Sequence, residues 1–198
     1  MRDAREIIQL TYQANAQINR IDVDTIQSDT KWSTSPVGLF KVNWDVAISK
    51  QNQRMGVGVI IRDERGKVNA ALSQTVCTVY DPTTAEIMAA LTAVELCRDM
   101  GFFDILLEGD SLMAVKAIKL QQEINASYGH LLEDIQLVLT TLRSCDIKHI
   151  RREANEAVHI LAREASKNHG NNIWVEETSV YFTHYFRAIS FIFVEAWL

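Results

Sequence analysis

The sequence predicts an α/β fold, and three observations carry this prediction. Residues 41–48 alternate between apolar and polar side chains, as in a strand that has one face on a core. Apolar residues between 83 and 100 recur at the 3.6-residue period of a helix. The apolar run 105–107 is soon followed by an amphipathic stretch at 110–120, which indicates a strand that leads into a helix. Strands and helices mixed in this way are typical of α/β domains.

The first part of the predicted domain is an antiparallel meander. Its three strands are expected at 41–48, 57–61 and 67–76. In the first strand Val42 and Trp44 fall on one face, and Asn43 and Asp45 fall on the other, because side chains alternate along a strand.

The second part alternates between helices and strands. Helices are expected at 83–100, 110–120, 128–142 and 154–166, and strands at 102–107 and 146–150. The order is therefore βββαβαβα, with one extra helix before the last strand.

The chain divides into three regions. Residues 1–36 are expected to form an N-terminal helix, at 5–19, and a polar linker. Residues 37–177 form the predicted domain, and 178–198 an apolar C-terminal tail. The tail carries His184, Arg187 and Glu195, so it is a poor membrane span, and no membrane association is expected.

Composition excludes several classes of protein. The 198 residues are 47% hydrophobic and 23% charged, which is typical of a globular protein and not of a disordered one. The net charge of −5 argues against nonspecific capture of polyanions, so a nucleic-acid binder must gather its basic residues on one face. Three distant cysteines, and no signal peptide at the start, favour an intracellular protein, nuclear or cytoplasmic, and not a secreted one.

Three carboxylates stand at positions where they could converge. Asp45 is on the polar face of the first strand, Glu86 is in the first turn of a helix, and Asp110 follows a strand. Each has a plain alternative: Asp45 as a solvated surface charge, Glu86 as part of a Thr83-x-x-Glu86 capping box, and Asp110 as a helix N-cap. Converging carboxylates are what magnesium requires, because it takes oxygen ligands.

Four motifs carry a resemblance to a known family. They are Val42-Asn43-Trp44-Asp45, Thr84-Ala85-Glu86-Ile87-Met88-Ala89-Ala90, Leu107-Glu108-Gly109-Asp110-Ser111 and Asn155-Glu156-Ala157-Val158-His159-Ile160-Leu161-Ala162. In order and spacing they resemble the ribonuclease H-like family, and most of all its plant, retroelement-derived, reverse-transcriptase-like branch. Lys31-Trp32, followed by Pro36 and Gly38, resembles the lead-in to such domains. The resemblance covers roughly residues 31–177.

The resemblance implies a fold and an activity. The fold is a mixed five-stranded sheet with helices on both faces. The activity is metal-dependent endonucleolytic cleavage of the RNA strand of an RNA/DNA hybrid by a monomer. The family's metal-binding carboxylates correspond to Asp45, Glu86 and Asp110, which would hold two Mg²⁺ ions, with Mn²⁺ as an alternative. Two such ions about 3.5–4 Å apart activate water and stabilise the leaving oxygen.

Two positions depart from the family pattern. His159 stands where ribonucleases H usually carry a fourth carboxylate, and we expect it to be a catalytic-site residue or a histidine hydrogen-bonded beside the site. Imidazole suits manganese or zinc better than magnesium. Val46 replaces a glycine, so its side chain could crowd the RNA strand.

Residues expected to contact nucleic acid come from several parts of the chain. They are Asn43, Val46, Asn52, Ser111, Arg151, Arg152 and Asn155. The basic residues Lys148, Arg151 and Arg152 are consistent with a phosphate track, and equally with a solvated face that pairs with nearby glutamates. The short polar stretch 121–127 carries no basic handle, which predicts weaker affinity for a hybrid.

Two other functions remain open at this point. A retroelement-derived domain could keep the fold and bind nucleic acid or a protein partner without cleaving. Alternatively, the aromatic tail could mediate assembly. Val46 and His159 favour the noncleaving domain, whereas the three carboxylates favour the enzyme.

Overall fold

The computed structural model describes residues 31–78, 80–120, 127–168 and 170–175. Its strands are β1 Phe40–Ser49, β2 Arg54–Arg62, β3 Val68–Val76, β4 Asp104–Gly109, β5 Ser144–His149 and β6 Asn171–Val175. Its helices are α2 Pro82–Met100, α3 Leu112–Leu120, α4 Gly129–Leu139 and α5 Glu156–Lys167, with a 3₁₀ turn η1 at Arg152–Asn155. The predicted α/β class and the order of the elements are confirmed.

The sheet is mixed and has the strand order β5-β4-β1-β2-β3-β6. The predicted meander β1-β2-β3 is antiparallel, and β4 runs parallel to both β1 and β5. The strand count of five was wrong, because β6 adds a sixth strand antiparallel to β3. This strand was missed because Asn171 and Asn172 are polar and exposed, and only Trp174 is partly buried. Such an edge strand has no clear alternation of apolar residues.

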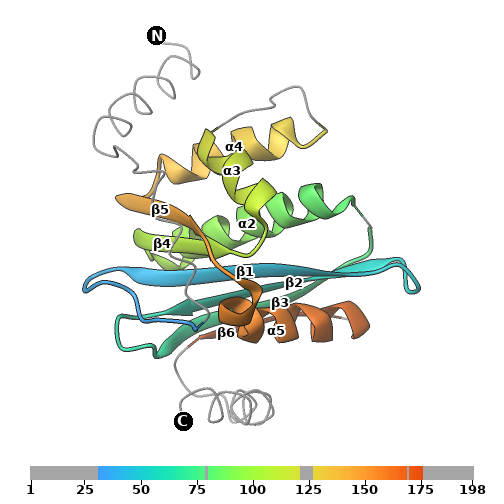
Figure 1. The fold of residues 1–198 in the computed structure, drawn as a ribbon, viewed down its shortest axis with the longest axis horizontal. Coiled ribbons are helices and arrows are strands. Elements are labelled where there is room, and N and C mark those ends of the chain that lie inside the picture. The colour runs from blue at the N-terminus through green and yellow to red at the C-terminus, as the bar shows by residue number, and fades with distance from the viewer. Residues whose placement is uncertain (1–30, 79, 121–126, 169, 176–198) are drawn as a thin grey trace.

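Helices cover both faces of the sheet, as expected (Figure 1). Helices α2, α3 and α4 pack over one face, where the larger core includes Trp44, Ile87 and Leu107. Of the described helices, α5 packs on the other face, where Val158 and Leu161 contact β2 and β3. The face of β1 that carries Asp45 is therefore covered by α5, and the alternative of Asp45 as a solvated surface charge was wrong.

Two glycines in β2 allow α5 to approach closely. A Cβ on Gly56 would lie 2.1 Å from the carbonyl oxygen of Ala162, and one on Gly58 would lie 2.7 Å from that of Val158. Because side chains at these positions would push the helix away, α5 rests directly on the backbone of β2. This contact brings His159 over β1.

The two capping alternatives for the carboxylates were wrong. The N-cap of α2 is Asp81, whose Oδ1 accepts hydrogen bonds from the backbone N–H groups of Thr83 and Thr84 at 3.1 Å each. At the start of α3 the Oγ of Ser111 accepts from the N–H of Ala114 at 3.3 Å. The carboxylates of Glu86 and Asp110 are therefore not used as helix caps.

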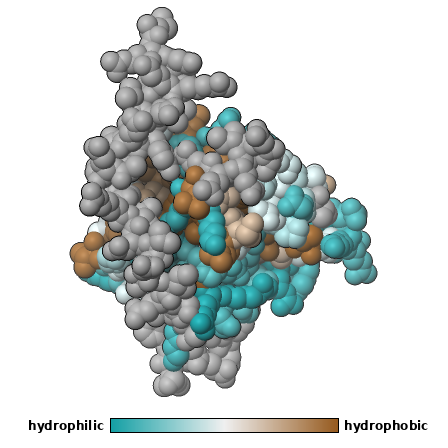
Figure 2. Space-filling view, turned by 45° about the horizontal axis from the view of Figure 1, so that its top comes forward, coloured by the Kyte–Doolittle hydropathy of each residue, from teal (hydrophilic) through white to brown (hydrophobic). Residues whose placement is uncertain are grey.

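Large apolar side chains are exposed at only a few described positions. They are Val37, Tyr80, Leu112, Met113, Leu120, Leu137, Ile173 and Val175. On the face shown in Figure 2, the described apolar residues form separate spots among hydrophilic ones. No helix in the described ranges is long and apolar enough to span a bilayer. The helix predicted at 5–19, the stretch 121–126 and the tail from 178 lie outside the described residues.

Candidate metal centre

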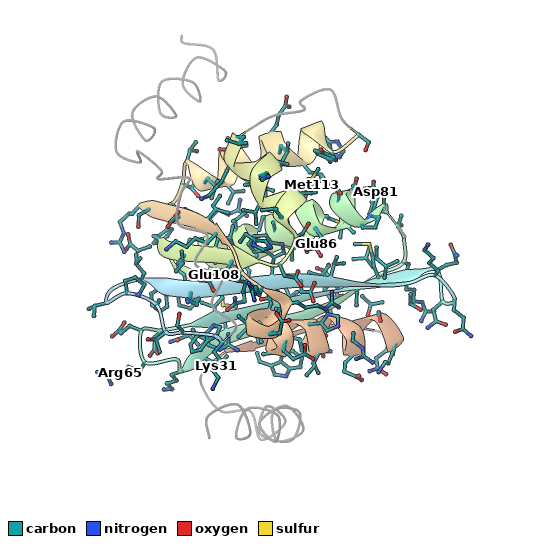
Figure 3. All side chains as sticks on the ribbon, viewed as in Figure 1. Lys31, Arg65, Asp81, Glu86, Glu108 and Met113 are labelled. Carbon is teal, nitrogen blue, oxygen red and sulfur yellow. The ribbon has the colours of Figure 1, made fainter. Side chains whose placement is uncertain are left out.

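The register of two parallel strands brings two of the predicted carboxylates together. Asn43 of β1 lies opposite Glu108 of β4, and this is the last pair of the ladder. Asp45 and Asp110 each follow two residues later, Asp45 still within β1 and Asp110 just after the end of β4, so they come close to one another. Glu86 reaches the same place from the sheet side of α2 (Figure 3). One ligand oxygen from each of the three residues lies within 4.8 Å of the others.

The packing of Trp44 explains why a glycine precedes Asp110. A Cβ on Gly109 would come within 2.3 Å of Cζ2 of the fully buried Trp44 indole. The absence of a side chain at Gly109 lets β4 lie against β1 at this level, and Asp110 then stands beside Asp45.

Burial and mutual repulsion dominate the electrostatics of the cluster. Burial and, to a lesser extent, the nearby Asp110 charge raise the pKa of Asp45 from 3.8 to about 6, although the hydrogen bonds from His159 and the Val46 N–H oppose this shift. Burial likewise raises the pKa of Glu86 from 4.5 to about 9, with contributions from Asp45 and Asp110. Both shifts show that the charged forms lack sufficient positive compensation from the protein.

A divalent cation fits this donor set. Oxygen ligands from three carboxylates suit Mg²⁺ or Mn²⁺, which are hard cations. Oε2 of Glu86 and Nε1 of Trp44 are both buried without a well-formed hydrogen bond among the described residues, and the indole N–H lies close enough to Glu86 to lower its pKa slightly. A buried carboxylate oxygen with so little compensation is costly, and coordination to a cation would satisfy it.

His159 lies beside the cluster as an outer partner. Its Nδ1 is 2.6 Å from Oδ2 of Asp45, and its Nε2 is 2.9 Å from Nη2 of Arg152. A guanidinium can only donate, so we assign the tautomer in which Nδ1–H donates to Asp45 and Nε2 accepts from Arg152. Both ring nitrogens are then engaged by protein groups. The cluster found within the described ranges accordingly comprises Asp45, Glu86 and Asp110, without His159.

Two of the predicted nucleic-acid contacts lie in the interior. The side chains of Asn43 and Asn155 are each 1% exposed. Asn43 Nδ2 donates to Oε2 of Glu108 at 3.2 Å and to Oδ1 of Asn155 at 3.3 Å, and Asn155 Nδ2 donates to the carbonyl of Trp44 at 2.9 Å. The prediction that these two amides contact nucleic acid directly is therefore wrong. Their hydrogen bonds go to other groups of the protein and hold η1 against β1.

The other predicted contacts are distributed around the cluster. Val46 is half-buried, and its side chain packs on the larger core. Asn52 lies exposed in the turn that joins β1 to β2, and Ser111 is half-buried beside Asp110. Arg151 and Arg152 are exposed where η1 begins. Asn52, Arg151 and Arg152 are therefore on the surface, and Ser111 lies beside the cluster. Val46 mainly packs against the core.

Sequence reasoning missed a buried charged network under the lead-in segment. Nζ of Lys41 lies 3.0 Å from Oε1 of Glu108, and both side chains are almost fully buried. Nη1 of Arg62 donates to Oδ1 of Asn43 at 3.1 Å, and Nε1 of Trp32 donates to the same oxygen at 3.2 Å. The available signal was the presence of Lys41 beside the apolar residues at the start of the first strand and of Arg62 directly after the apolar run of the second.

Solved structures with the same architecture define the fold class. The RNase H1 of the halophilic archaeon Halobacterium salinarum NRC-1 is 27% identical, with a TM-score of 0.60 over 65% of this chain and 97% of that chain. The N-terminal RNase H domain of a Mycobacterium tuberculosis protein is 15% identical, with a TM-score of 0.59 over 65% and 93%. LC11-RNase H1, solved in complex with an RNA/DNA hybrid, is 19% identical, with a TM-score of 0.58 over 65% and 96%. The protein therefore has an RNase H-like fold.

The family follows from the sequence match. A family model described as reverse transcriptase-like matches residues 43–165. The chain belongs to this reverse transcriptase-like family. No similar protein was found among curated proteins. The plant branch of the resemblance stays a prediction.

Proposed function

We propose that this protein is an RNase H-type nuclease that cuts the RNA strand of RNA/DNA hybrids. The observation that carries the proposal is the convergence of Asp45, Glu86 and Asp110 within 4.8 Å, in a fold shared with RNases H1. One of these relatives was solved with an RNA/DNA hybrid. Asp45 is buried and Glu86 and Asp110 are half-buried, which favours a site built for a cation over an incidental surface cluster.

The three carboxylates would hold Mg²⁺, or Mn²⁺ in its place. When bound, such a cation lowers the pKa of a water molecule and stabilises charge on phosphate oxygens. Asp45 is fixed for this role because its Oδ1 accepts from the N–H of Val46 at 2.7 Å and its Oδ2 accepts from His159. Glu86 contributes a buried oxygen from α2, and Asp110 contributes from the end of β4.

The surface beside the cluster would bind the nucleic acid. Arg151, Arg152 and Lys148 are exposed and precede or begin the segment that leads into α5, where they could contact phosphates. Ser111 adjoins the cluster, and Asn52 could meet a sugar hydroxyl, the group that distinguishes RNA from DNA. A protein with net charge −5 needs such a local concentration of basic residues.

A second candidate is a domain that binds nucleic acid, or a protein partner, without cleaving. The observation in its favour is that both ring nitrogens of His159 are engaged by Asp45 and Arg152. The side chain that replaces the family's fourth carboxylate is thereby unavailable as a metal ligand. Reduced metal binding at this position would lower turnover while leaving the fold intact.

The test is cleavage of an end-labelled RNA/DNA hybrid in Mg²⁺ and, separately, in Mn²⁺. The nuclease predicts cleavage by the native protein that is lost in Asp110→Asn, with thermal stability maintained. Binding of the hybrid without cleavage in either metal would favour the second candidate. Failure to bind the hybrid at all would reject the nucleic-acid function in both forms. We further propose that the protein acts inside the cell, in a reducing compartment that suits its three free thiols, and that it acts there as a monomer.

A further inference from the structure

The guanidinium of Arg152 lies next to the carboxylate cluster on its solvent-exposed side. Nη1 of Arg152 lies 3.9 Å from Oδ2 of Asp110, and Arg152 also lowers the pKa of Glu86, though by less than the burial and carboxylate charges raise it. The side chain of Arg152 is 62% exposed, whereas that of Asp110 is 9% exposed. The positive charge therefore faces both the cluster and the solvent from which a substrate would arrive.

This guanidinium is held in place by His159. Nη2 of Arg152 is 2.9 Å from Nε2 and 3.2 Å from Nδ1 of the imidazole. The imidazole is itself 13% exposed and anchored on the buried Asp45. His159 lies on α5, whose position is fixed by its close contact with Gly58 of β2. The Arg152 guanidinium thus has a hydrogen-bond partner on α5, although its side chain is largely exposed.

Asp45 could bridge two metal ions only by using every lone-pair position that its protein contacts leave free. Its Oδ1 accepts the Val46 N–H at 2.7 Å, and its Oδ2 accepts from His159 at 2.6 Å. An ionised carboxylate has about four lone-pair positions in all, so each oxygen keeps one for a cation. A bridging role would use every remaining position and would place a second cation next to Arg152.

We propose that the cluster binds a single divalent cation, and that Arg152, held by His159, supplies the second positive charge and contacts a phosphate oxygen of the substrate. One divalent cation and one guanidinium balance the three carboxylate charges. A guanidinium also matches the geometry of phosphate oxygens through paired N–H donors. The phosphate contact rests on the proposed nuclease function, whereas the number of cations does not. His159 is, in this arrangement, a positioning residue.

The first experiment counts bound Mn²⁺ in the absence of nucleic acid, by calorimetric titration of the full chain and by the electron paramagnetic resonance signal of free Mn²⁺. We expect one Mn²⁺ per chain. Arg152→Ala should bind Mn²⁺ about threefold to tenfold more tightly, because it removes a like charge close to the cation in a partly exposed site. Arg152→Lys keeps the charge and should remain near the native affinity.

The control is Arg143→Ala. Arg143 pairs with Asp104 at the other end of β4, so its removal should leave Mn²⁺ affinity unchanged. His159→Asp replaces the neutral support with a carboxylate and should raise the count to two Mn²⁺ per chain. Two Mn²⁺ ions on the native protein, or none, would overturn the proposal, as would an unchanged affinity in Arg152→Ala.

Cleavage of the hybrid separates this inference from the proposed nuclease function. If the native protein cleaves, Arg152→Ala should lower kcat by roughly tenfold to a hundredfold with a smaller change in KM, because the contact strengthens as charge develops on the phosphate. Tighter Mn²⁺ binding combined with slower cleavage is a pairing that a purely structural role would not produce. If the native protein binds one Mn²⁺ but does not cleave, the nuclease proposal fails while the single-cation centre stands. Equal cleavage by Arg152→Ala and the native protein would reject the phosphate contact.

Discussion

Gly109 lies directly against the indole ring of Trp44, and this contact sets the distance between the two strands that carry Asp45 and Asp110. A Cβ on Gly109 would stand 2.3 Å from Cζ2 and 2.5 Å from Cε2 of the ring. Real Cβ atoms do not approach this closely, so either the indole or β4 must move. Trp44 is fully buried and has little room to do so.

Gly109→Ala should therefore damage both the fold and the metal centre. We expect a loss of about 1–3 kcal/mol in the free energy of unfolding from overpacking. Displacement of Asp110 from Asp45 should also weaken Mn²⁺ binding. Denaturant unfolding and Mn²⁺ titration measure the two effects separately.

Gly38→Ala is the matched control for this substitution. Gly38 has φ +82° and no atom within 4 Å of its Cβ position, so alanine there meets backbone strain but no neighbour. A stability loss of about 1–2 kcal/mol with unchanged Mn²⁺ affinity is expected. If Gly109→Ala behaves in the same way, the Trp44 contact does not set the geometry of the centre.

The stability of the metal-free protein should fall as pH rises. The pKa of Asp45 is raised from 3.8 to about 6, and that of Glu86 from 4.5 to about 9. A carboxyl group with a raised folded-state pKa holds its proton more tightly when folded. The protonated carboxyl group therefore contributes to the free energy of unfolding. This contribution is complete below the pKa of the unfolded state and is lost as pH rises through the pKa of the folded state. The thermal unfolding temperature in chelator should thus decrease between about pH 5 and about pH 9.

Added Mn²⁺ should reverse much of this loss, because it binds the ionised cluster of the folded state. Glu86→Gln removes the group with the larger shift and should flatten the pH dependence in chelator. A stability profile that is flat over this range for the native protein would contradict the electrostatic account of the cluster. So would a Glu86→Gln profile as steep as the native one.

Much of the centre could be predicted from local patterns. Asp45 is marked by the alternation of the first strand, and Asp110 by the apolar run before it. Each pattern extends over only a few residues, and together with the family motifs these patterns place three carboxylates at one end of the sheet. The structure confirms that Asp45, Glu86 and Asp110 converge.

The remainder depended on contacts between distant parts of the chain. Asn43 and Asn155 looked like surface amides, because nothing in their neighbouring residues shows that η1 folds back onto β1 over a separation of 112 residues. The contact of Arg152 with His159 spans only seven residues, but it depends on the 3₁₀ geometry of η1 directly before α5, which the helical periodicity of the sequence does not show. Local periodicity contains no information on which polar groups will meet in the interior.

The ion pair of Lys41 and Glu108 should be costly to break from one side. Their side chains are 4% and 6% exposed, and the charged atoms are 3.0 Å apart. Glu108→Gln would leave the buried ammonium of Lys41 without its counter-charge, and we expect a loss of about 3–5 kcal/mol in the free energy of unfolding. Lys41→Met combined with Glu108→Gln should cost less than Glu108→Gln alone, since the buried ammonium is removed together with its counter-charge, whereas the buried Arg62 loses the charge of Glu108 in both proteins. Denaturant unfolding of the three proteins tests this order.

The exposed pair of Arg143 and Asp104 provides the comparison. Arg143 is 72% exposed, so Asp104→Asn should change the free energy of unfolding by less than about 1 kcal/mol. A similar cost for Glu108→Gln would show that the Lys41 ammonium is solvated when its partner is removed.

The lead-in segment should contribute to stability, although the family match begins only at residue 43. The ring of Trp32 lies 4.8 Å from the guanidinium carbon of Arg62 and 5.3 Å from Nζ of Lys41. Its Nε1–H donates to the buried Asn43. Trp32→Phe keeps an aromatic face over the two cations but removes the donor, for an expected loss of about 1 kcal/mol.

Trp32→Ala removes the ring as well, and we expect a loss of about 2–3 kcal/mol in denaturant unfolding, since cation–π contacts of this kind contribute roughly 0.5–1 kcal/mol each. Val37→Ala is the control from the same segment, because Val37 is 89% exposed and its truncation should stay within about 0.5 kcal/mol. If Trp32→Ala were as mild as Val37→Ala, the lead-in segment would be dispensable for folding. The graded order of Trp32→Ala, Trp32→Phe and Val37→Ala would instead show that the domain begins before the matched region, with Trp32 covering the buried charges of Lys41 and Arg62.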